Sequence, residues 1–499
     1  MSPVAGRTWL GIDLGTQSVR AVAVDDRGAL RAGAARPLES RRADGPGGSA
    51  RHEQDPASWC RAVDAALAEV VAAIDPGSVG GLAVDGTSGT VLLVDDAGTP
   101  LTPGVMYDDA RGSDHVARVR EAGAALWERL GYRVGATWAL PTVLALRDEH
   151  PRGRVRHQTD VVTAHLVGTP TATDASTALK TGYDVVEGRW PTEVLTALGV
   201  DPDRLPAVVR PGTRLGGLGA DAAAATGLRA GTPVVAGMTD GCAAQIGAGA
   251  VAPGHWNSVL GTTLVLKGVT VDLLHDPTGT VYCHRGPQGG WWLPGGASST
   301  GAGVLSEVVD PDRFEAVTAT LTDAGAPTAA PVVYPLGGRG ERFPFAAARA
   351  EGFWLDGDRA RPLGELADAV GETAAFAGLC EGVAFVERLC FAHLAGLGAD
   401  VSGTRSISGG ATRNPWWNQR RADALGVPVH RPRSAEPAFG MAMLARASGE
   451  ADGGEPDLVR VAAEMVHLDE VCEPRADPAL DERYATFCRA LAARGWIEG

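Results

Sequence analysis

Short apolar runs, separated by small and acidic residues, divide much of the chain into predicted strands. Such runs occupy residues 9–14, 19–24, 79–85, 91–95 and 234–239. Apolar side chains recur at helical spacing over residues 59–74 and 376–390, which predicts two long helices. The first begins at Pro56 with Asp55 as its N-cap, and the second covers residues 373–396. This mixture of strands and helices indicates an α/β fold.

The predicted strand at residues 234–239 ends in one carboxylate, Asp240, which lies between Gly237 and Gly241. A helix-like run follows at once. In open α/β folds, ligands bind beyond the carboxyl ends of strands. Asp240 is therefore a candidate catalytic base facing a substrate. The alternative is that Asp240 only caps the helix, a common position for Asp.

The runs at residues 9–14 and 19–24 predict a hairpin with a small, hydroxyl-rich tip, Gly15-Thr16-Gln17-Ser18. Backbone N–H groups and hydroxyls of such a tip can approach a phosphate. Asp13, beside the tip, can hold Mg²⁺ through water. The alternative is an ordinary hairpin turn.

Residues 260–263, Leu-Gly-Thr-Thr, repeat the Leu-Gly-Thr-Gln of the first tip and again lie between two predicted strands. The second copy has no counterpart of Asp13. Two such hairpins indicate an internal duplication, with two related α/β domains that each offer one phosphate-binding hairpin. A nucleotide triphosphate between them would use both tips.

Short or forked polar side chains follow other predicted strands. Thr87, Ser88, Asp109 and Arg111 offer hydrogen-bonding groups that suit a polyol or sugar. The alternative for Asp109 and Arg111 is a surface ion pair of little energetic worth.

Glycines precede a further predicted helix, which has Asn414 as its N-cap. Gly409 and Gly410 let the backbone there lie against a flat or anionic ligand. Residues 275–300 and 334–344 are rich in glycine and are predicted to be irregular loops. The helix from Pro437 is rich in small residues and able to pack closely.

Composition excludes several classes of protein. The 499 residues are 44% hydrophobic, which indicates a globular protein of two to four domains. The net charge of −15 and the lack of a basic block argue against nucleic acid as a partner. No apolar run is long enough to cross a membrane, and no signal peptide is recognisable, so we expect a cytoplasmic protein. Seven scattered cysteines predict reduced thiols.

Two details bear on cofactors. The chain has only two lysines, Lys180 and Lys267, and no Walker A pattern, so phosphates would have to be held by backbone N–H groups and a metal. Residues 247–252 fit a loose dinucleotide fingerprint, but they follow a helix instead of a strand, which argues against a nicotinamide-dependent enzyme.

Six short motifs together resemble the FGGY carbohydrate kinase family of the actin–Hsp70–sugar kinase superfamily, over nearly the whole chain and in the family's order. They are Gly11-Ile-Asp-Leu-Gly-Thr16, Glu53-Gln-Asp-Pro56, Ala236-Gly-Met-Thr-Asp240, Leu260-Gly-Thr-Thr263, Gly338-Arg-Gly-Glu-Arg-Phe-Pro344 and Ser408-Gly-Gly-Ala411. The resemblance implies two ribonuclease H-like domains, residues 1–250 and 251–499, around a central cleft. It also implies phosphorylation of a sugar or polyol by ATP with Mg²⁺.

The resemblance also implies roles for single residues, which we carry over only where the motifs match. Asp240 is the general base and Asp13 helps to hold Mg²⁺. The nucleotide is approached by Thr16, Gln17, Gly261, Thr262, Thr263, Gly410, Ala411 and Asn414. The sugar side comprises Thr87, Ser88 and Asp109, together with Asp240.

The substrate is predicted from residues 85–89, Asp-Gly-Thr-Ser-Gly. Xylulose kinases typically carry a Gln-Met-His segment there, whereas the Asp-Gly-Thr-Ser form is similar to D-ribulose kinases of the xylulose-kinase-like branch. We therefore expect D-ribulose, with D-xylulose and other polyols as alternatives. Hypotheses of a different class are a chaperone or filament protein of the same superfamily and a non-catalytic sugar- and nucleotide-binding protein. A homodimer is left open.

Overall fold

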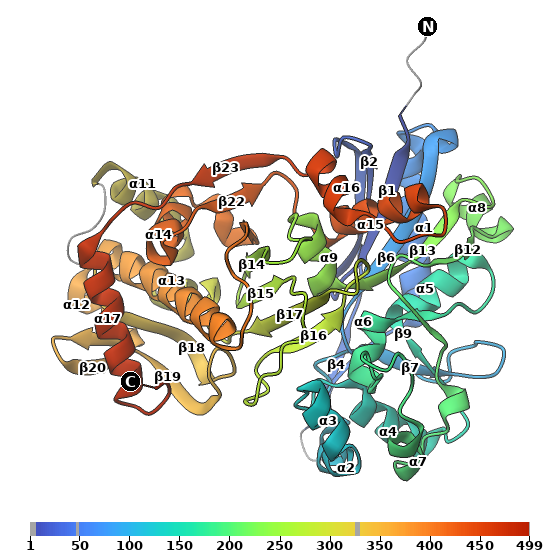
Figure 1. Ribbon diagram of the computed structural model, residues 1–499, viewed down its shortest axis with the longest axis horizontal. Helices are drawn as coiled ribbons and strands as arrows, with labels where there is room; N and C mark the ends of the chain where they lie inside the picture. The colour runs from blue at the N-terminus through green and yellow to red at the C-terminus, as the bar shows by residue number, and fades with distance from the viewer. Residues whose placement is uncertain (1–5, 46–48, 325–329, 499) are drawn as a thin grey trace, which may run out of the picture. The chain divides into compact units, whose positions relative to one another are not determined.

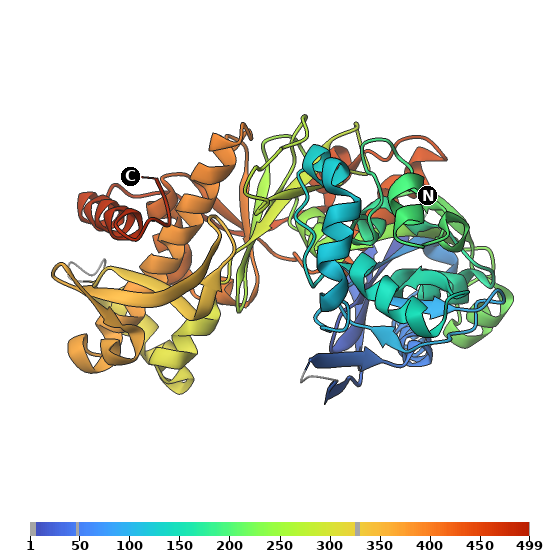
Figure 2. The same ribbon diagram turned by 90° about the horizontal axis from the view of Figure 1, so that it is seen from below.

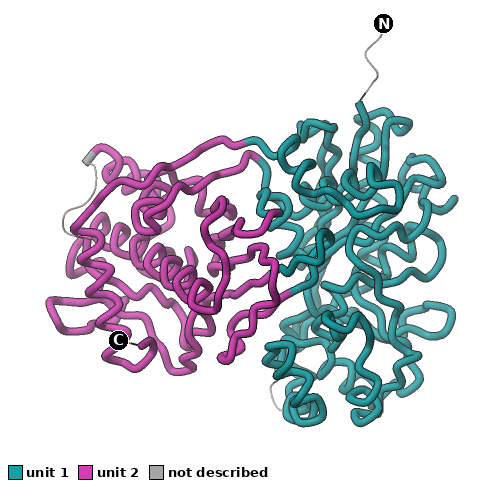
Figure 3. Tube along the Cα trace, viewed as in Figure 1, with its two compact units in different colours: residues 1–251, 284–293, 434–467 teal, residues 252–283, 294–433, 468–499 magenta. Residues whose placement is uncertain are grey.

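Two sheets of the same topology organise the computed structural model, which describes residues 6–45, 49–324 and 330–498. The chain divides into two units (Figure 3). Unit 1 comprises Met1–Val251, His284–Leu293 and Ser434–His467, and unit 2 comprises Ala252–Cys283, Pro294–Arg433 and Leu468–Gly499.

The sheet of unit 1 has the order β12-β13-β6-β1-β2-β3. Strands β1, β6 and β13 are parallel, whereas β2 is antiparallel to both β1 and β3. Their bounds are β1 Thr8–Leu14, β2 Ser18–Asp25, β3 Leu30–Pro37, β6 Val79–Gly86, β12 Arg214–Gly217 and β13 Pro233–Thr239.

The second sheet repeats this plan. Its order is β16-β17-β15-β14-β21-β22-β23, with β14, β21 and β22 parallel and β15 antiparallel to both β14 and β17. The bounds are β14 Trp256–Leu260, β15 Leu264–Gly268, β16 Tyr282–Arg285, β17 Trp292–Ala297, β21 Arg405–Ser408, β22 Val429–Pro432 and β23 Leu468–Cys472. The repeated hairpin tip is therefore part of a repeated sheet, as the predicted duplication requires.

Helices cover both faces of the first sheet. Leu10 and Ile12 point to the face where helix α1 (Pro56–Ala72) buries Trp59 and Val63. The N-cap of α1 is Asp55, as predicted, and its side chain accepts a hydrogen bond from the N–H of Ala57. The opposite face carries Gly11, and helix α15 (Pro437–Ala451) lies there beside β1 and β6 (Figure 1).

Helix α15 lies against backbone, which explains its small residues. A Cβ at Gly11 would be 1.7 Å from the Ala438 carbonyl oxygen, and one at Gly440 would be 2.0 Å from that of Ala243 on helix α9 (Asp240–Gly247). Only glycine allows such approaches. The first segment of unit 1 ends at Val251, and the predicted domains were residues 1–250 and 251–499. The structure in addition assigns residues 284–293 and 434–467 to unit 1.

Helix α13 (Glu372–Gly396) is the long helix expected over residues 373–396, and it packs against β18 in unit 2 (Figure 2). Helix α14 (Pro415–Leu425) is joined to it by two buried ion pairs, Arg420–Glu381 at 2.7 Å and Arg421–Glu387 at 2.8 Å. Among the described residues, none of the helices combines the length and apolar character needed to cross a membrane.

Two predictions of irregular loops were wrong. Residues 275–300 contain β16 and β17, and residues 334–344 lie largely in β18 (Val333–Glu341), which pairs with β19 (Ala347–Asp356); β20 is Arg359–Pro362. Two glycines of β17 permit close packing. A Cβ at Gly296 would be 2.7 Å from the Phe343 ring, and one at Gly295 would be 3.0 Å from the Leu266 carbonyl oxygen.

A smaller sheet of unit 1, β4-β5-β8-β7-β9, adjoins the site described below. Its strands are β4 Arg41–Asp44, β5 Ala50–Gln54, β7 Val91–Val94, β8 Gly104–Val105 and β9 Arg154–His157. Helix α5 (Gln158–Val167) follows β9.

Candidate active site

Three aspartates lie at the carboxyl ends of adjacent parallel strands in unit 1. Asp13 is on β1, Asp85 is paired with it on β6, and Asp240 follows β13 as the first residue of α9. Because carboxyl ends of parallel strands meet at one edge of a sheet, the predicted base and the predicted metal-holding residue belong to the same edge. Their charges influence one another.

Asp240 has a tightly fixed backbone. The preceding Thr239 donates its N–H to the Ser176 Oγ at 3.0 Å, and Ser176 is itself bonded to Asp174. Asp174 caps the short helix α6 (Ala175–Ala178) by accepting from the N–H groups of Ser176 and Thr177. The side chain of Asp240 accepts from the N–H of Gly241 at 2.7 Å. The polar cluster at residues 173–176 thus positions the end of β13.

Asp85 was not among the predicted site residues. Its side chain is fully buried, and neither of its carboxyl oxygens has a hydrogen-bond partner among the described residues. Burial and the charges of Asp13 and Asp240 raise the pKa of Asp85 well above its usual range. Burial and the charge of Asp240 also raise the pKa of Asp13, to about 6. Burial and the proximity of the three carboxyl groups thus disfavour the charged forms of Asp85 and Asp13.

Hydrogen bonds to two backbone carbonyl oxygens fix one side of the first hairpin tip. The carbonyl oxygen of Thr16 accepts from the Gln54 side chain at 2.6 Å, and that of Gln17 accepts from the N–H of Leu38 at 2.8 Å. In a trans peptide the N–H points away from the carbonyl oxygen, so the following N–H groups point to the other side of the tip. Gln17 is exposed. This geometry suits the predicted approach to a phosphate.

The second hairpin tip, at residues 261–263, is also fixed by hydrogen bonds to its backbone carbonyl oxygens. Ala302 and Gly303 donate their N–H groups to the carbonyl oxygens of Gly261 and Thr262, at 2.9 and 3.2 Å. Thr262 is exposed and Thr263 is half-buried. Both tips therefore have bonded carbonyl groups on one side and side chains open to solvent.

The predicted sugar-side residues differ in what they can offer. Thr87 is buried and bonds to Gln158, with its N–H at 3.0 Å and its Oγ1 at 2.8 Å from the Gln158 Oε1. The Ser88 hydroxyl has no hydrogen-bond partner among the described residues. Sequence reasoning missed Lys180, which donates to the Ser88 carbonyl oxygen at 3.1 Å. Only position in space brings Lys180 here, and no local pattern indicates it.

Asp109 is enclosed in hydrogen bonds. Its side chain has no exposed surface, and it accepts from the Arg111 guanidinium at 2.8 Å and from the His52 N–H at 2.7 Å. Arg111 also bonds to Glu53 at 2.7 Å. The pair is buried and is not the surface ion pair of the alternative reading. Asp109 therefore orients Arg111, and direct contact between Asp109 and a sugar is not supported by this burial.

The predicted nucleotide-side loop follows β21. Gly409 has a φ of +92°, and a Cβ there would be 2.4 Å from the Leu260 carbonyl oxygen. Gly410 is exposed, with open space where a Cβ would be, and Ala411 is half-buried. Asn414 caps α14 by accepting from Trp417 and donates to Thr318 at 2.9 Å. A ligand could lie against Gly410, whereas the Asn414 side chain is engaged within the protein.

The donor set beside the first tip fits Mg²⁺. This cation prefers oxygen ligands, and proteins usually supply one or two carboxylates while water and phosphate complete the shell. Asp13 and Asp240 are such carboxylates. Over the described residues no group of three or more His, Cys, Asp or Glu side chains is arranged to hold a metal ion alone. A metal here would accordingly be shared with a phosphate.

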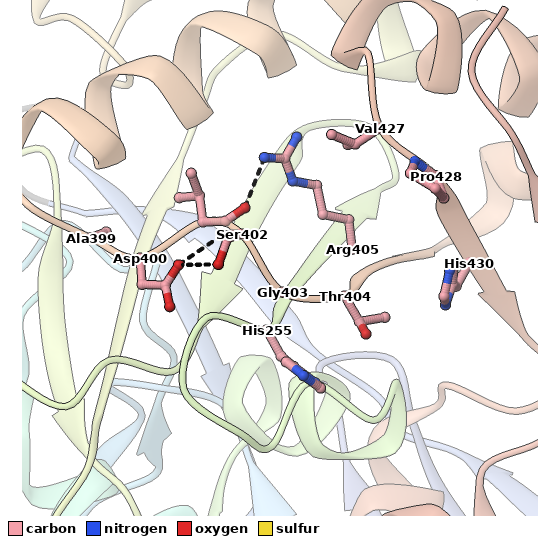
Figure 4. Close-up of a pocket in the computed structure, with 11 residues that line it drawn as sticks. His255, Ala399, Asp400, Ser402, Gly403, Thr404, Arg405, Val427, Pro428 and His430 are labelled. Atoms are coloured by element: carbon pink, nitrogen blue, oxygen red, sulfur yellow. Dashed lines mark hydrogen bonds between the residues drawn. The ribbon is translucent and has the colours of Figure 1, made fainter.

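A separate pocket of about 870 Å³ lies in unit 2 and is lined by His255, Asp400, Arg405 and His430 among others (Figure 4). Arg405 donates to the Val401 carbonyl oxygen at 2.9 Å, and Asp400 accepts from Ser402. His255 precedes β14 and Arg405 begins β21, so the pocket is at the amino ends of these strands. The second tip is at their carboxyl ends, and we do not assign the pocket to the reaction.

Comparison with known proteins matches this arrangement. A sequence model of the FGGY family of carbohydrate kinases, N-terminal domain, matches residues 8–247, and one of the C-terminal domain matches residues 256–448. A xylulose kinase of Streptomyces rubiginosus is 29% identical over 471 residues, which cover 92% of this chain and 91% of the relative. An apulose kinase of Pectobacterium atrosepticum is 28% identical over 506 residues, 97% of each chain.

Solved structures agree in fold. A xylulose kinase from Rhodospirillum rubrum has a TM-score of 0.82 at 26% identity, covering 98% of this chain and 99% of the other. A protein described as a xyloylose kinase from Brucella ovis has a TM-score of 0.86 at 24% identity, covering 98% and 99%. The predicted two-domain α/β architecture is confirmed.

Proposed function

Because this chain belongs to the FGGY family of carbohydrate kinases, which are phosphotransferases, we propose that it transfers a phosphoryl group from ATP to a hydroxyl of a ketopentose, with D-ribulose as the preferred substrate. The proposal is supported by the end of β6, where Thr87 and Ser88 stand in place of the Gln-Met-His segment of xylulose kinases. These are small side chains. The Thr87 side chain is bonded to Gln158, whereas the Ser88 Oγ is buried without a hydrogen-bond partner among the described residues, so Ser88 is the one we propose as a partner for a substrate hydroxyl.

Different residues of unit 1 would accept the proton, hold the metal and bind the phosphate. Asp240 accepts the proton of the attacking hydroxyl, because its carboxylate is fixed at the end of β13 next to the sugar-side residues. Asp13 would hold Mg²⁺ together with phosphate oxygens and water. The metal, when bound, neutralises charge on the phosphates. N–H groups at the tip around Thr16 and Gln17 bind phosphate oxygens.

D-Xylulose is the second candidate, and a specific observation favours it: the relative from Streptomyces rubiginosus carries the name xylulose kinase. The two ketopentoses are epimers. Discrimination between them depends on whether one hydroxyl finds its partner, which is the kind of difference that the Ser88 region would make.

The test is an assay of ADP release with Mg-ATP and, separately, D-ribulose, D-xylulose, L-ribulose, L-xylulose, glycerol and ribitol. We expect the highest kcat/KM with D-ribulose. A higher kcat/KM with D-xylulose would make D-xylulose the preferred substrate instead of D-ribulose. No stimulation by any of the six would overturn the ketopentose proposal and favour either a polyol outside this set or the non-catalytic alternative.

A further inference from the structure

Glu341, at the end of β18, accepts an unusual number of hydrogen bonds for a buried carboxylate. Only 4% of its surface is exposed. Its Oε1 accepts from the N–H groups of Ser299 at 2.6 Å and Arg342 at 2.9 Å. Its Oε2 accepts from the hydroxyls of Ser298, Thr300 and Tyr334 at 3.0, 3.0 and 3.1 Å. Burying a charge is costly unless it is compensated in this way.

Three of these donors belong to one loop. Ser298, Ser299 and Thr300 begin the segment at residues 298–303, which we call the backing loop. Within it, Thr300 also donates its N–H to the Ser298 Oγ at 2.9 Å. Glu341 therefore fixes the first half of the backing loop, whereas Tyr334 and Arg342 anchor the carboxylate itself to unit 2.

The backing loop in turn fixes the second hairpin tip. Leu264, at the end of the tip, donates to the Thr300 carbonyl oxygen at 2.8 Å. Ala302 and Gly303 donate to the carbonyl oxygens of Gly261 and Thr262. The approach is so close that a Cβ at Gly301 would be 2.4 Å from the Thr262 carbonyl oxygen. No side chain fits between loop and tip.

This contact decides where the tip directs its amides. The carbonyl oxygens of Gly261 and Thr262 face the backing loop, and in trans peptides the N–H groups of the next residues point the opposite way. The N–H groups of Thr262 and Thr263 are therefore turned away from the loop. Consecutive N–H groups on one side of a turn form an anion-binding concavity.

We propose that Glu341 is a positioning residue for phosphate binding: through the backing loop it directs the N–H groups of Thr262 and Thr263 towards a phosphate of the nucleotide. The inference rests on the proposed function, since it takes that tip to be a phosphate-binding element. It goes further by giving a role to the Gly338–Pro344 motif, whose acidic residue touches no reacting atom.

The test compares Glu341→Gln with Glu351→Gln as a matched control. Gln keeps the shape of Glu but replaces one acceptor oxygen by an NH₂ group, which cannot accept the hydroxyl donors. Glu351 is on the neighbouring strand β19, has a side chain 70% exposed and pairs only loosely with Arg339 at 3.6 Å. Each variant is titrated with Mg-ADP by calorimetry, assayed for KM of ATP and of sugar, and mapped by amide hydrogen exchange.

For Glu341→Gln we expect Mg-ADP to bind about tenfold more weakly, because a strong hydrogen bond to a charged group is lost. KM for ATP should rise with it while KM for the sugar stays constant. Exchange should accelerate at residues 261–263 and 298–303 only. Glu351→Gln should match the unaltered protein. A second variant, Gly301→Ala, keeps every Glu341 contact but pushes the tip, and should show the same nucleotide defect.

The results that would contradict the inference differ from those that would contradict the proposed function. Unchanged Mg-ADP affinity in Glu341→Gln, or equal increases in both KM values, would show a purely structural role and overturn the inference. Failure of the unaltered protein to bind Mg-ADP would overturn it together with the proposed function. A protein that binds Mg-ADP but phosphorylates no sugar would overturn only the proposed function, because affinity and exchange still report on Glu341.

Discussion

At the scale of single residues, three carboxylates on neighbouring strands have different surroundings. Asp240 begins a helix and accepts from a backbone N–H, Asp85 is fully buried, and Asp13 lies between burial and solvent. Like charges placed so close together disfavour one another's ionised forms. Burial and this repulsion raise the pKa of both Asp13 and Asp85.

Replacing Asp240 by Asn removes the proposed base but keeps the shape of the side chain. We expect kcat to fall by about 10²-fold or more, the usual contribution of a general base, while Mg-ADP affinity stays unchanged. Steady-state kinetics and calorimetry measure the two quantities. A kcat within about tenfold of the unaltered enzyme would show that Asp240 is not the base.

Replacing Asp13 by Ala removes one predicted oxygen ligand of the metal. We expect the Mg²⁺ concentration for half-maximal activity to rise about tenfold, an effect typical of altered metal sites. Titration with Mg²⁺ at saturating ATP and sugar measures it. The exposed Asp96, with 73% of its side chain accessible, provides the control as Asp96→Ala. An unchanged metal titration for Asp13→Ala would contradict the assignment.

At the scale of elements, the two hairpin tips are both fixed by hydrogen bonds to their carbonyl groups, but the donors come from different parts of the chain. The first is held by a side chain, Gln54, and the second by the backing loop that Glu341 organises. Gln54 also accepts from the Trp59 indole at 2.7 Å, so helix α1 contributes to the position of the first tip. The motif at residues 53–56 thus joins the start of helix α1 to the first hairpin tip.

Substitution of Gln54 by Leu should therefore loosen the first tip without creating a cavity in the core, because the Gln and Leu side chains are of similar size. We expect KM for ATP to rise about tenfold while KM for the sugar changes little, through loss of the bond to Thr16. Gln419→Leu is the comparison, because Gln419 on α14 is half-buried and donates hydrogen bonds to Asp423 and to the Glu473 carbonyl oxygen, away from both tips. If Gln54→Leu changed only thermal stability, its link to phosphate binding would be refuted.

A loop of unit 2 shows how hydrogen bonding makes stability depend on pH. Burial alone would raise the pKa of Asp276, but hydrogen bonds from His393, Thr280 and Thr278 hold it below its usual range. A carboxyl group with a lowered folded-state pKa stabilises the protein above its unfolded pKa of about 3.9 and loses this contribution as pH falls.

The Asp276→Asn variant should consequently melt at a lower temperature than the unaltered protein at pH 7. The gap in Tm should narrow as the pH is lowered from about 5 towards 3, where the native carboxylate loses its advantage. Scanning calorimetry at several pH values measures this gap. A gap that stayed constant would mean that the charge of Asp276 does not stabilise the fold.

At the scale of the whole molecule, chain order and folding units do not coincide. Residues 434–467 return to unit 1 after the chain has built most of unit 2. Helix α15 from this segment covers one face of β1 and β6, and its contact with Gly11 excludes even a methyl group. The core of unit 1 is therefore completed only when nearly the whole chain is present.

Residues 1–251 alone should then fail to form a stable unit, because the face of the sheet that carries Gly11 would be exposed. Joining residues 434–467 to them through a flexible linker should restore protease resistance and a cooperative melting transition. Limited proteolysis and circular dichroism provide the measurements. A stable, cooperative fragment of residues 1–251 would contradict the structural role of α15.

Local patterns in the sequence predicted the strands at residues 9–14, 19–24, 79–85, 91–95 and 234–239, the two long helices, both hairpins and the place of Asp240 at a strand end, because burial periodicity, capping residues and strand ends act over a few neighbours. The resemblance built on these motifs predicted the family, which the comparisons confirmed. Tertiary structure alone decided the rest. It paired Asp85 with Asp13, brought Lys180 to Ser88, enclosed Asp109 with Arg111 and moved residues 434–467 into unit 1.

The physical reason is the same in each case. Apart from the Asp109–Arg111 pair, these contacts join residues far apart in the chain, and their geometry is set by which strands lie side by side. The glycine-rich stretches taken for loops are strands for that reason too: a missing side chain permits a turn and equally permits close packing, and only the neighbour shows which applies.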